Sequence, residues 1–510
     1  MGSEQAILES KAEEFFVISE EINNNNNNDQ NNIEHEKLKI NIFINNANNE
    51  NKYAIKIYSI DHNNKTILLE STQSEKNNIV NFENFVIDYI FEKKQDILFE
   101  IKINDKIYEI NKNIANILLS RKGIFYTKID QNLNEILFIS AEKLNKSQNL
   151  LNLNLYFENN SSANFTLPKY KQIMIISNDT QKLYKSECMN DEGRFNRVKI
   201  PINLLKPKFE IQILNSHTKI PTKIKTTINE ISDINKFNHK VPVSLKGNKS
   251  FILKSKSKLI KNYSFVDFIK NGIQIDLIIG IDYTSSNGNP ENEDSLHYIN
   301  DKNPNDYEKC ILSIGNIISN YNLDQLYPVY GFGAKIKNGK YDDVNHCFPI
   351  NFEENPNIKS INEIIEYYHN SLQNLEFSSP TFFSPIINRV IQDIKKIGTV
   401  SKYYILMMLT DGNIDDMGDT IDSLVEASLL PLSLIIIGIG NTSFSQMGEI
   451  NNNKEPLISS GGIKTSRNIV QFIPFNDYKN EPEKIAEKIL KKIPSQVIEF
   501  YDSIQQYPEN

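Results

Sequence analysis

The sequence contains few cysteines: Cys188, Cys310 and Cys347 are the only three among its 510 residues. No two of them have the C-x-x-C spacing of a zinc module, so the sequence indicates neither a structural zinc site nor a disulfide framework. This cysteine usage is typical of a protein from a reducing compartment.

An excess of positive charge is also missing. The formal net charge is -8, whereas a surface that binds nucleic acid through its phosphates needs a basic excess. We therefore expect no nucleic acid among the partners of this protein.

The sequence has no long apolar run. The longest strongly apolar stretch, residues 429–440, holds 12 residues, and about 20 are needed to cross a bilayer. Residues 1–14 contain four glutamates in place of the basic flank and apolar run of a signal peptide. We predict neither a transmembrane helix nor secretion.

An asparagine-rich leader precedes the first predicted strand. Residues 23–28 are all asparagine and lie in a polar, acidic stretch that cannot bury enough apolar surface to offset the chain entropy. We predict that residues 1–35 are disordered. The rest of the chain is long enough for about three domains, since single domains hold roughly 100 to 200 residues.

Two sets of short predicted strands follow the leader. Several alternate apolar and polar residues, as half-buried strands do. This pattern predicts two tandem all-β sandwiches, over residues 36–146 and 148–263. The predicted strands are 38–44, 53–58, 97–103 and 136–141 in the first set, and 151–157, 173–176, 209–213 and 250–254 in the second.

From about residue 264 apolar strands alternate with helical stretches. This alternation is typical of a parallel sheet wrapped by helices, and it predicts one α/β doubly wound domain over residues 264–505. The predicted strands are 273–282, 326–330, 403–409, 432–438 and 469–473, and the predicted helices are 307–319, 360–372, 385–397, 420–429 and 482–501.

Oxygen-bearing side chains follow the strands of this third domain. The first strand is almost entirely apolar and continues into Asp282, Thr284 and Ser286, at the sheet edge where ligands bind in such folds. Thr381 and Asp411 lie in two other loops of the same edge. Hydroxyls and carboxylates suit a hard cation, so these five residues predict a site for Mg²⁺ or Mn²⁺. The D-x-T-x-S segment alone also fits a turn capped by hydroxyls.

Two carboxylates only balance the charge of a divalent ion, so the bound metal could take an outside carboxylate into an open position. This arrangement resembles the metal-ion-dependent adhesion site of von Willebrand A-type domains. The resemblance extends to the copine family, whose A-type domain is similar to this chain over about residues 264–505. It is carried by the blocks 268–272, 286–290, 295–299, 330–334, 380–387, 410–412 and 469–475.

Copines place two C2 domains ahead of the A-type domain, which agrees with the two predicted sandwiches. The resemblance implies that the C2 pair targets phospholipid membranes in response to Ca²⁺, and that the A-type domain captures partner proteins. It also implies a cytoplasmic protein that binds reversibly to the surface of the plasma membrane or of endosomes.

The acidic loop residues that would hold Ca²⁺ in the C2 pair are largely missing. In the second sandwich the loops are residues 157–168 and 213–217, with Glu158 as the only acid, and in the first they are 45–50 and 104–106, with at most one acid each. Neutral oxygens alone hold Ca²⁺ poorly. We predict that neither C2 domain binds Ca²⁺ at signalling concentrations.

A run of lysines without an intervening acid offers another route to membranes. Anionic lipid attracts each nearby lysine by about 1 kcal/mol, although a solvated strand face would have the same composition. The predicted lipid-contacting residues are Lys240, Lys246, Lys249, Lys254, Lys256, Lys258 and Lys261.

The sequence thus favours a non-enzymatic, membrane-associated adaptor. The alternative is a calcium-insensitive protein-binding scaffold in the cytosol. An enzyme with Asp282 as nucleophile is disfavoured, because no second aspartate stands at Thr284 and no basic residue accompanies the segment. We expect His297 to be a hydrogen-bonded residue that packs a loop.

Overall fold

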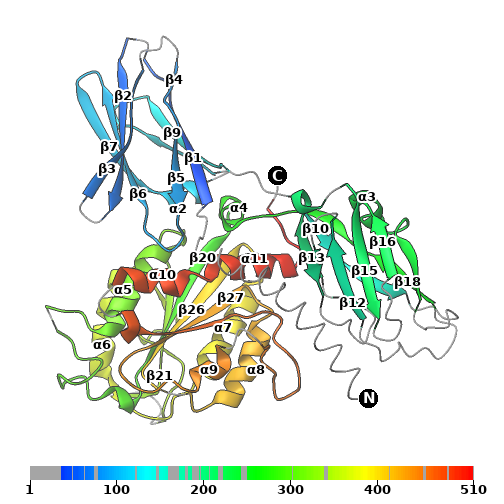
Figure 1. Ribbon diagram of the computed structural model, residues 1–510. Helices are drawn as coiled ribbons and strands as arrows, with labels where there is room; N and C mark the ends of the chain where they lie inside the picture. Colours follow the sequence, from blue (N-terminus) through cyan, green and yellow to red (C-terminus); the bar gives the residue numbers. More distant parts are fainter. Residues whose placement is uncertain are drawn as a thin grey trace. The chain divides into compact units, whose positions relative to one another are not determined.

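The computed structural model describes most of the chain after the leader (Figure 1). The leader, Lys246, Lys249 and most of the second sandwich's first loop lie outside the described residues. The described residues are 36–508 except 49, 62–63, 74–77, 121–122, 145–148, 159–171, 179–181, 187–193, 196, 206, 216–221, 243–249, 301, 338–342, 413, 452–454 and 479–481.

The first domain is an antiparallel β-sandwich with one short helix, α2 (Ile114–Leu119). Along β1, Leu38, Ile40, Ile42 and Ile44 are buried and alternate with more exposed residues, as the predicted period of two requires. One sheet holds β1 (Glu36–Asn45), β4 (Ile79–Asn81), β5 (Phe85–Tyr89), β8 (Ile124–Lys128) and β9 (Ile136–Lys143), and the other holds β2 (Tyr53–Asp61), β3 (Asn64–Gln73), β6 (Asp96–Ile103) and β7 (Lys106–Asn113).

The second domain is also an all-β structure and forms a compact unit of its own, residues 146–264. Its first and last strands pair antiparallel, with Asn149 opposite Lys261. The chain therefore begins and ends this unit at the same place. Its strands are β10 (Asn149–Leu153), β11 (Leu155–Glu158), β12 (Gln172–Ser177), β13 (Lys182–Lys185), β14 (Val198–Pro201), β15 (Phe209–Asn215), β16 (Thr222–Thr226), β17 (Asn238–Pro242), β18 (Ser250–Ser255) and β19 (Lys258–Lys261).

The third domain is built on a mainly parallel sheet in the order β23-β21-β20-β26-β27-β28. The central strands are buried on both faces, which explains their nearly continuous apolar sequence. The parallel strands are β20 (Gln274–Asp282), β21 (Tyr327–Phe332), β26 (Lys402–Thr410), β27 (Leu432–Gly438) and β28 (Val470–Pro474), and the short antiparallel strands β23 (Phe348–Pro349) and β24 (Asn357–Ile358) pair with β21.

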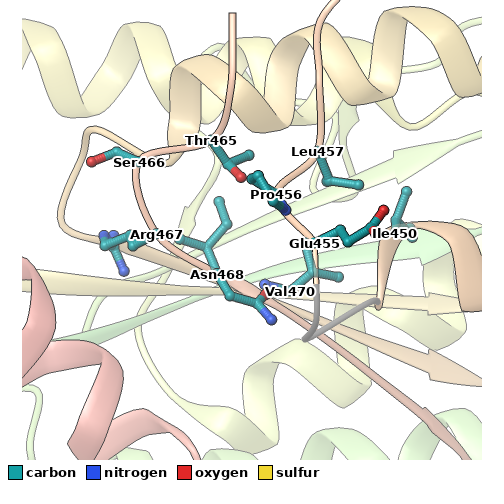
Figure 2. A pocket seen from close by; sticks show the side chains of 10 residues that line it. Ile450, Glu455, Pro456, Leu457, Thr465, Ser466, Arg467, Asn468 and Val470 are labelled. Atoms are coloured by element: carbon teal, nitrogen blue, oxygen red, sulfur yellow. Dashed lines mark hydrogen bonds between the residues drawn. The ribbon is translucent and has the colours of Figure 1, made fainter. Parts of the chain in front are cut away.

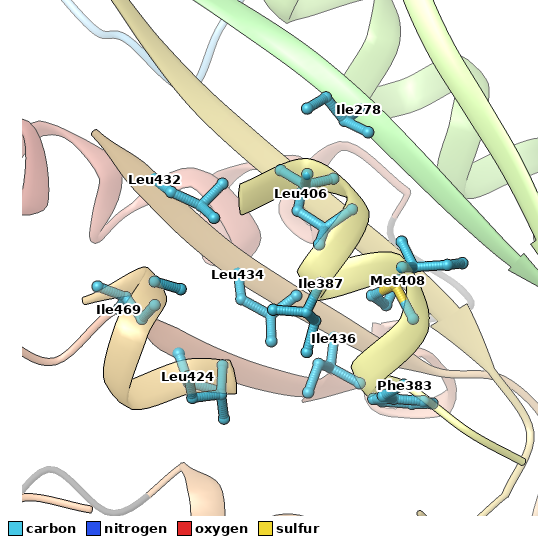
Figure 3. Close-up of a cluster of buried hydrophobic side chains, with 14 of the residues drawn as sticks. Ile278, Phe383, Ile387, Leu406, Met408, Leu424, Leu432, Leu434, Ile436 and Ile469 are labelled. Carbon is cyan, nitrogen blue, oxygen red and sulfur yellow. The ribbon is translucent and has the colours of Figure 1, made fainter. Parts of the chain in front are cut away.

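Helices pack on both faces of this sheet. On one face, Ile387 of α7 and Leu424 of α8 share a core with Leu406 and Leu434 of the central strands (Figure 3). On the other face, the ring of Phe500 contacts that of Tyr403. The helices are α4 (Phe265–Lys270), α5 (Asp306–Ile318), α6 (Ile361–Asn374), α7 (Ser384–Ile397), α8 (Met417–Ala427), α9 (Met447–Ile450), α10 (Pro482–Leu490) and α11 (Ile493–Ser503).

The predicted fold class, two β-sandwiches followed by an α/β domain, is confirmed. One predicted helix, 482–501, is two helices in the structure, α10 and α11. Pro494 lies in the first turn of α11, where its missing N–H is tolerated, and it could not continue α10. No helix in the described part of the chain is long and apolar enough to cross a membrane.

The first sandwich and the A-type domain belong to one compact unit, although the second sandwich separates them in sequence. The hydroxyls of Tyr89 and Tyr321 lie 2.7 Å apart, and both side chains are buried. The ring of Phe91 packs edge-on against Phe265 and Tyr321, at centroid distances of 4.8 and 4.9 Å. Aromatic pairs of this geometry stabilise a contact beyond their buried area.

Polar contacts surround this aromatic core. Lys143 forms an ion pair with Asp267 of α4 at 2.9 Å, and Lys270 donates to the carbonyl of Ala141 at 2.8 Å. Helix α4 precedes β20 and Tyr321 precedes β21. The first sandwich therefore contacts the amino edge of the parallel sheet, and the carboxyl edge faces away from it.

Reversing either charge of the Lys143–Asp267 pair is expected to destabilise the full chain. Only 15 % and 20 % of these side chains are exposed, so Lys143→Glu or Asp267→Lys should cost roughly 1 to 3 kcal/mol. The double reversal should recover most of the loss in thermal unfolding. The control is the well exposed pair Lys56–Glu70, whose reversal should change nothing measurable. A double variant no more stable than either single variant would contradict the role of this contact.

Candidate metal centre

The site begins where β20 ends, at the fully buried Asp282. Its Oδ1 accepts hydrogen bonds from the backbone N–H and the hydroxyl of Thr284, at 2.8 and 2.6 Å. Its Oδ2 accepts a hydrogen bond from the Thr410 hydroxyl at 2.5 Å. A short 3-10 turn, residues 285–287, then brings the Ser286 hydroxyl within 3.0 Å of that of Thr284.

Asp411 directly follows the neighbouring parallel strand β26. Its Oδ1 accepts a hydrogen bond from the Ser286 hydroxyl at 2.8 Å. Four of the five predicted ligands, Asp282, Thr284, Ser286 and Asp411, are therefore joined in one chain of hydrogen bonds across two loops. Ser286 is exposed, so the cluster opens to solvent on its side.

Thr381 comes from a third loop, between β25 (Leu375–Phe377) and α7. The side chain is mostly buried, and its Oγ1 lies 3.9 Å from the position that a Cβ would occupy at Gly412, next to Asp411. The structure thus brings all three predicted loops to one edge of the sheet.

The charges of this cluster fit a divalent cation. Burial, and then the charge of Asp411, raises the pKa of Asp282 to about 7, and burial raises the pKa of Asp411 as well. In the described part of the chain, the hydrogen-bond partners of the two carboxylates are hydroxyl and backbone N–H groups, and no three His, Cys, Asp or Glu side chains gather as metal ligands. Two buried carboxylates beside three hydroxyls therefore lack a counterion, and Mg²⁺ or Mn²⁺ could supply it.

Mn²⁺ binding is expected to weaken as the pH falls below about 7, the pKa of Asp282. Below this pH the carboxyl carries a proton that the cation must displace, so the affinity should fall by up to about tenfold per pH unit. Calorimetry of the full chain at pH 6, 7 and 8, in two buffers of different ionisation enthalpy, measures both the affinity and the protons released. An affinity that stays constant from pH 8 to pH 6 would contradict this prediction.

Two residues outside the five predicted ligands support the site. One is Thr410, whose hydroxyl holds the second oxygen of Asp282. The other is His297, which is fully buried and contacts the Asp282 carbonyl at 2.8 Å through Nε2 and the Tyr368 hydroxyl at 2.7 Å through Nδ1. Burial lowers the pKa of His297 to about 3. The neutral ring must donate from Nε2, because a carbonyl only accepts, and this agrees with the expected packing role.

The predicted lipid-contacting lysines that the structure describes lie on more than one sheet. Lys240 and Lys254 lie on the β11-β18-β17 sheet, whereas Lys258 and Lys261 lie on the β14-β10-β19 sheet. Lys254 forms an ion pair with Glu158 at 2.5 Å, and the Lys256 ammonium lies 5.3 Å from the centre of the Tyr156 ring. The lysine run contains no acid in sequence, but in the structure Glu158 of the paired strand β11 lies next to it. Lipid contact by these lysines stays a prediction.

In the first sandwich, an amide side chain of one predicted calcium loop forms hydrogen bonds with residues that directly follow the other loop. The Asn104 side chain accepts the Lys52 N–H at 2.9 Å and donates to Asn51 at 2.8 Å. In the second sandwich, the ion pair with Lys254 occupies Glu158, the single acid of the predicted calcium loops.

We expect no saturable Ca²⁺ binding by the two sandwiches in the micromolar range, because no predicted loop holds more than one acid and Glu158 is already paired with Lys254. The measurement is calorimetry of the full chain with Asp411→Ala, which removes the contribution of the A-type domain. Micromolar binding that persists in this variant would contradict the prediction.

A separate cavity of about 250 Å³ lies beside β28, lined by residues 450, 455–457 and 465–470 (Figure 2). The Arg467 side chain on its wall has a structural role, because it donates hydrogen bonds to the Tyr403 hydroxyl at 3.0 Å and to the Leu432 carbonyl at 2.8 Å. This cavity contains none of the predicted ligands.

Comparison with known proteins agrees with the sequence resemblance. The copine family model matches residues 295–509. Copine-A of Dictyostelium discoideum is 39 % identical over 243 residues, which are 47 % of this chain and 40 % of that protein. The chain therefore matches about two fifths of the length of this curated relative.

Three solved structures are also similar to parts of this chain. Proximal thread matrix protein 1 from the mussel byssus is 16 % identical, with 43 % of this chain and 47 % of that chain covered and a TM-score of 0.27. Manganese-loaded TRAP protein of Plasmodium vivax is 13 % identical, covering 40 % and 70 %, with a TM-score of 0.27. The pair of C2 domains of Extended-Synaptotagmin 2 is 12 % identical, covering 45 % and 93 %, with a TM-score of 0.17.

Proposed function

We propose that this chain, whose residues 295–509 match the copine family model, is a non-enzymatic adaptor. In this proposal the A-type domain binds an acidic group of a partner protein through Mg²⁺ or Mn²⁺. The two C2-type sandwiches bring the chain to anionic phospholipid at the cytoplasmic face of the plasma membrane or of endosomes.

The observation that carries this proposal is the buried pair Asp282 and Asp411, whose partners among the described residues are hydroxyl and N–H groups and not cations. The pair would hold the ion together with Thr284, Ser286 and Thr381. The ion would supply a positive centre for a carboxylate from outside, since two acids only balance its charge. Exposed Ser286 leaves that side of the cluster open to a partner.

A chemical reaction is not part of the proposal. His297 is locked as a neutral hydrogen-bonding residue between Asp282 and Tyr368. Thr284 donates its hydroxyl proton to Asp282 and stands where a second acid would be needed. These contacts support binding and give no acid and base pair for catalysis.

The second candidate function is a cytosolic scaffold whose membrane binding does not respond to Ca²⁺. The amide hydrogen bonds of Asn104 and the ion pair of Glu158 with Lys254 favour it over a calcium-triggered adaptor. Sedimentation with vesicles of phosphatidylcholine, with and without phosphatidylserine, in EGTA or in Ca²⁺, separates the two. A phosphatidylserine preference that needs Ca²⁺ would favour the calcium-triggered adaptor, and no preference in either condition would remove the lipid role.

The test of the metal-dependent role uses the full chain. Mn²⁺ binding is measured by calorimetry, and partner capture from cell extract is compared in Mg²⁺ and in EDTA. Wild type should bind Mn²⁺ and retain partners only with Mg²⁺, whereas Asp411→Ala should do neither. The matched control is Glu366→Ala, which removes an exposed acid of α6 and should behave as wild type. Wild-type protein without Mn²⁺ binding would end the proposal.

A further inference from the structure

Two acids outside the five candidate ligands hold the loop of Thr381 against the loop of Asp411. The Asp415 carboxylate accepts the Thr381 N–H at 2.8 Å, and the Asp415 N–H donates to the Thr381 carbonyl at 2.9 Å. Both backbone polar groups of Thr381 are therefore bound by a single residue, which lies four positions after Asp411 in the chain.

Asp416 fixes the other end of the Thr381 loop. Its two carboxylate oxygens accept the N–H groups of Phe383 and Ser384, each at 2.9 Å, where the 14-residue helix α7 begins. The same carboxylate accepts the Thr420 hydroxyl of α8 at 3.0 Å. A carboxylate at the N-terminus of a helix satisfies free N–H groups and meets the positive end of the helix dipole.

Resting on the proposed function, we propose that Asp415 and Asp416 are positioning residues of the metal centre. They fix the Thr381 hydroxyl relative to Asp411, so that the third loop is already in place when the cation arrives. A neutral hydroxyl adds no charge, so its contribution depends on where it is held, and residues that orient ligands typically affect metal affinity about 10- to 100-fold.

Direct attraction between these acids and the cation would be a different explanation. Asp415 is exposed to solvent, so its charge is screened and its direct pull on the ion is weak. Its carboxylate and its backbone N–H each form one hydrogen bond with the Thr381 backbone. Geometry therefore favours an action through Thr381.

A double-mutant cycle on the full chain tests this action, with Mn²⁺ affinity measured by calorimetry and by the electron paramagnetic resonance of free Mn²⁺. Asp415→Ala is expected to weaken binding about tenfold. Thr381→Ala should weaken it at least as much, and the double variant should be no weaker than Thr381→Ala within about threefold, because both act through one hydroxyl. Losses that multiply in the double variant would overturn the proposal.

Asp415→Asn keeps a hydrogen-bond acceptor and removes the charge. Its Mn²⁺ affinity should stay within about threefold of wild type, whereas a loss equal to that of Asp415→Ala would assign the effect to charge and overturn the positioning role. Thermal unfolding in EDTA identifies any variant that fails to fold. If wild type binds Mn²⁺ and Asp415→Ala binds it equally well, only the positioning role fails, whereas a wild type without binding also ends the proposed function.

Discussion

Replacing Asp282 by asparagine is expected to abolish Mn²⁺ binding and, at pH 8, to raise the unfolding temperature of the metal-free protein. The two effects have one cause. Burial raises the pKa of Asp282 from 3.8 to about 7, so above pH 7 the folded state carries a charge that costs stability relative to the unfolded state. The neutral amide removes this cost, and it also removes half of the negative charge that would hold the cation.

The measurement is thermal unfolding in EDTA and in excess Mn²⁺. A cation at 100 times its dissociation constant stabilises the wild-type fold by about 2.7 kcal/mol, and Asp282→Asn should show no such gain. Glu366→Gln, on the exposed surface of α6, should respond to Mn²⁺ as wild type does. An asparagine variant that Mn²⁺ still stabilises would refute the assignment of Asp282 as a ligand.

Replacing Gly333 by alanine is expected to weaken metal binding, although Gly333 is not one of the predicted ligands. Gly333 has a φ of +79°, and a Cβ there would lie 2.3 Å from the Thr284 methyl and 3.3 Å from the Thr284 backbone N. The left-handed backbone alone costs about 1 to 3 kcal/mol for a residue with a side chain. The clash must in addition displace Thr284, so we expect at least a tenfold loss of Mn²⁺ affinity, of the order found when ligands lose their support.

Gly398→Ala is the matched control for this variant. Gly398 has a φ of +63° at the end of α7, and the nearest atom to a Cβ there is 3.7 Å away. This variant should lose a similar amount of stability to backbone strain while binding Mn²⁺ as wild type does. Equal Mn²⁺ affinity for Gly333→Ala and Gly398→Ala would show that Thr284 does not need its observed position.

The predicted ligands could be found from the sequence because carboxyl ends of parallel strands share one sheet edge. Asp282 and Asp411 each close an apolar strand, so their meeting follows from the predicted fold. The roles of Asp415 and Asp416 could not be predicted from the sequence, because they accept hydrogen bonds from backbone N–H groups more than 30 residues away. No local sequence pattern identifies a backbone group as the partner of a distant acid.

The same limit applies to the contacts between domains. Tyr89 and Tyr321 are 232 positions apart, and each belongs to a segment that looks ordinary for its own fold. Three domains in series were the natural prediction from strand and helix patterns. That the first and third share one compact unit depends on contacts between side chains far apart in the sequence.

The pairing of β10 with β19 gives the chain a tolerance to cleavage. Because this unit begins and ends at one place, two covalent links, one before residue 149 and one after residue 261, join it to the rest of the protein. A protease that cuts only one link leaves the second sandwich attached through the other. After a cut near residue 146, the buried tyrosine pair and the Lys143–Asp267 bridge would keep the two pieces of the first unit associated without a peptide bond between them.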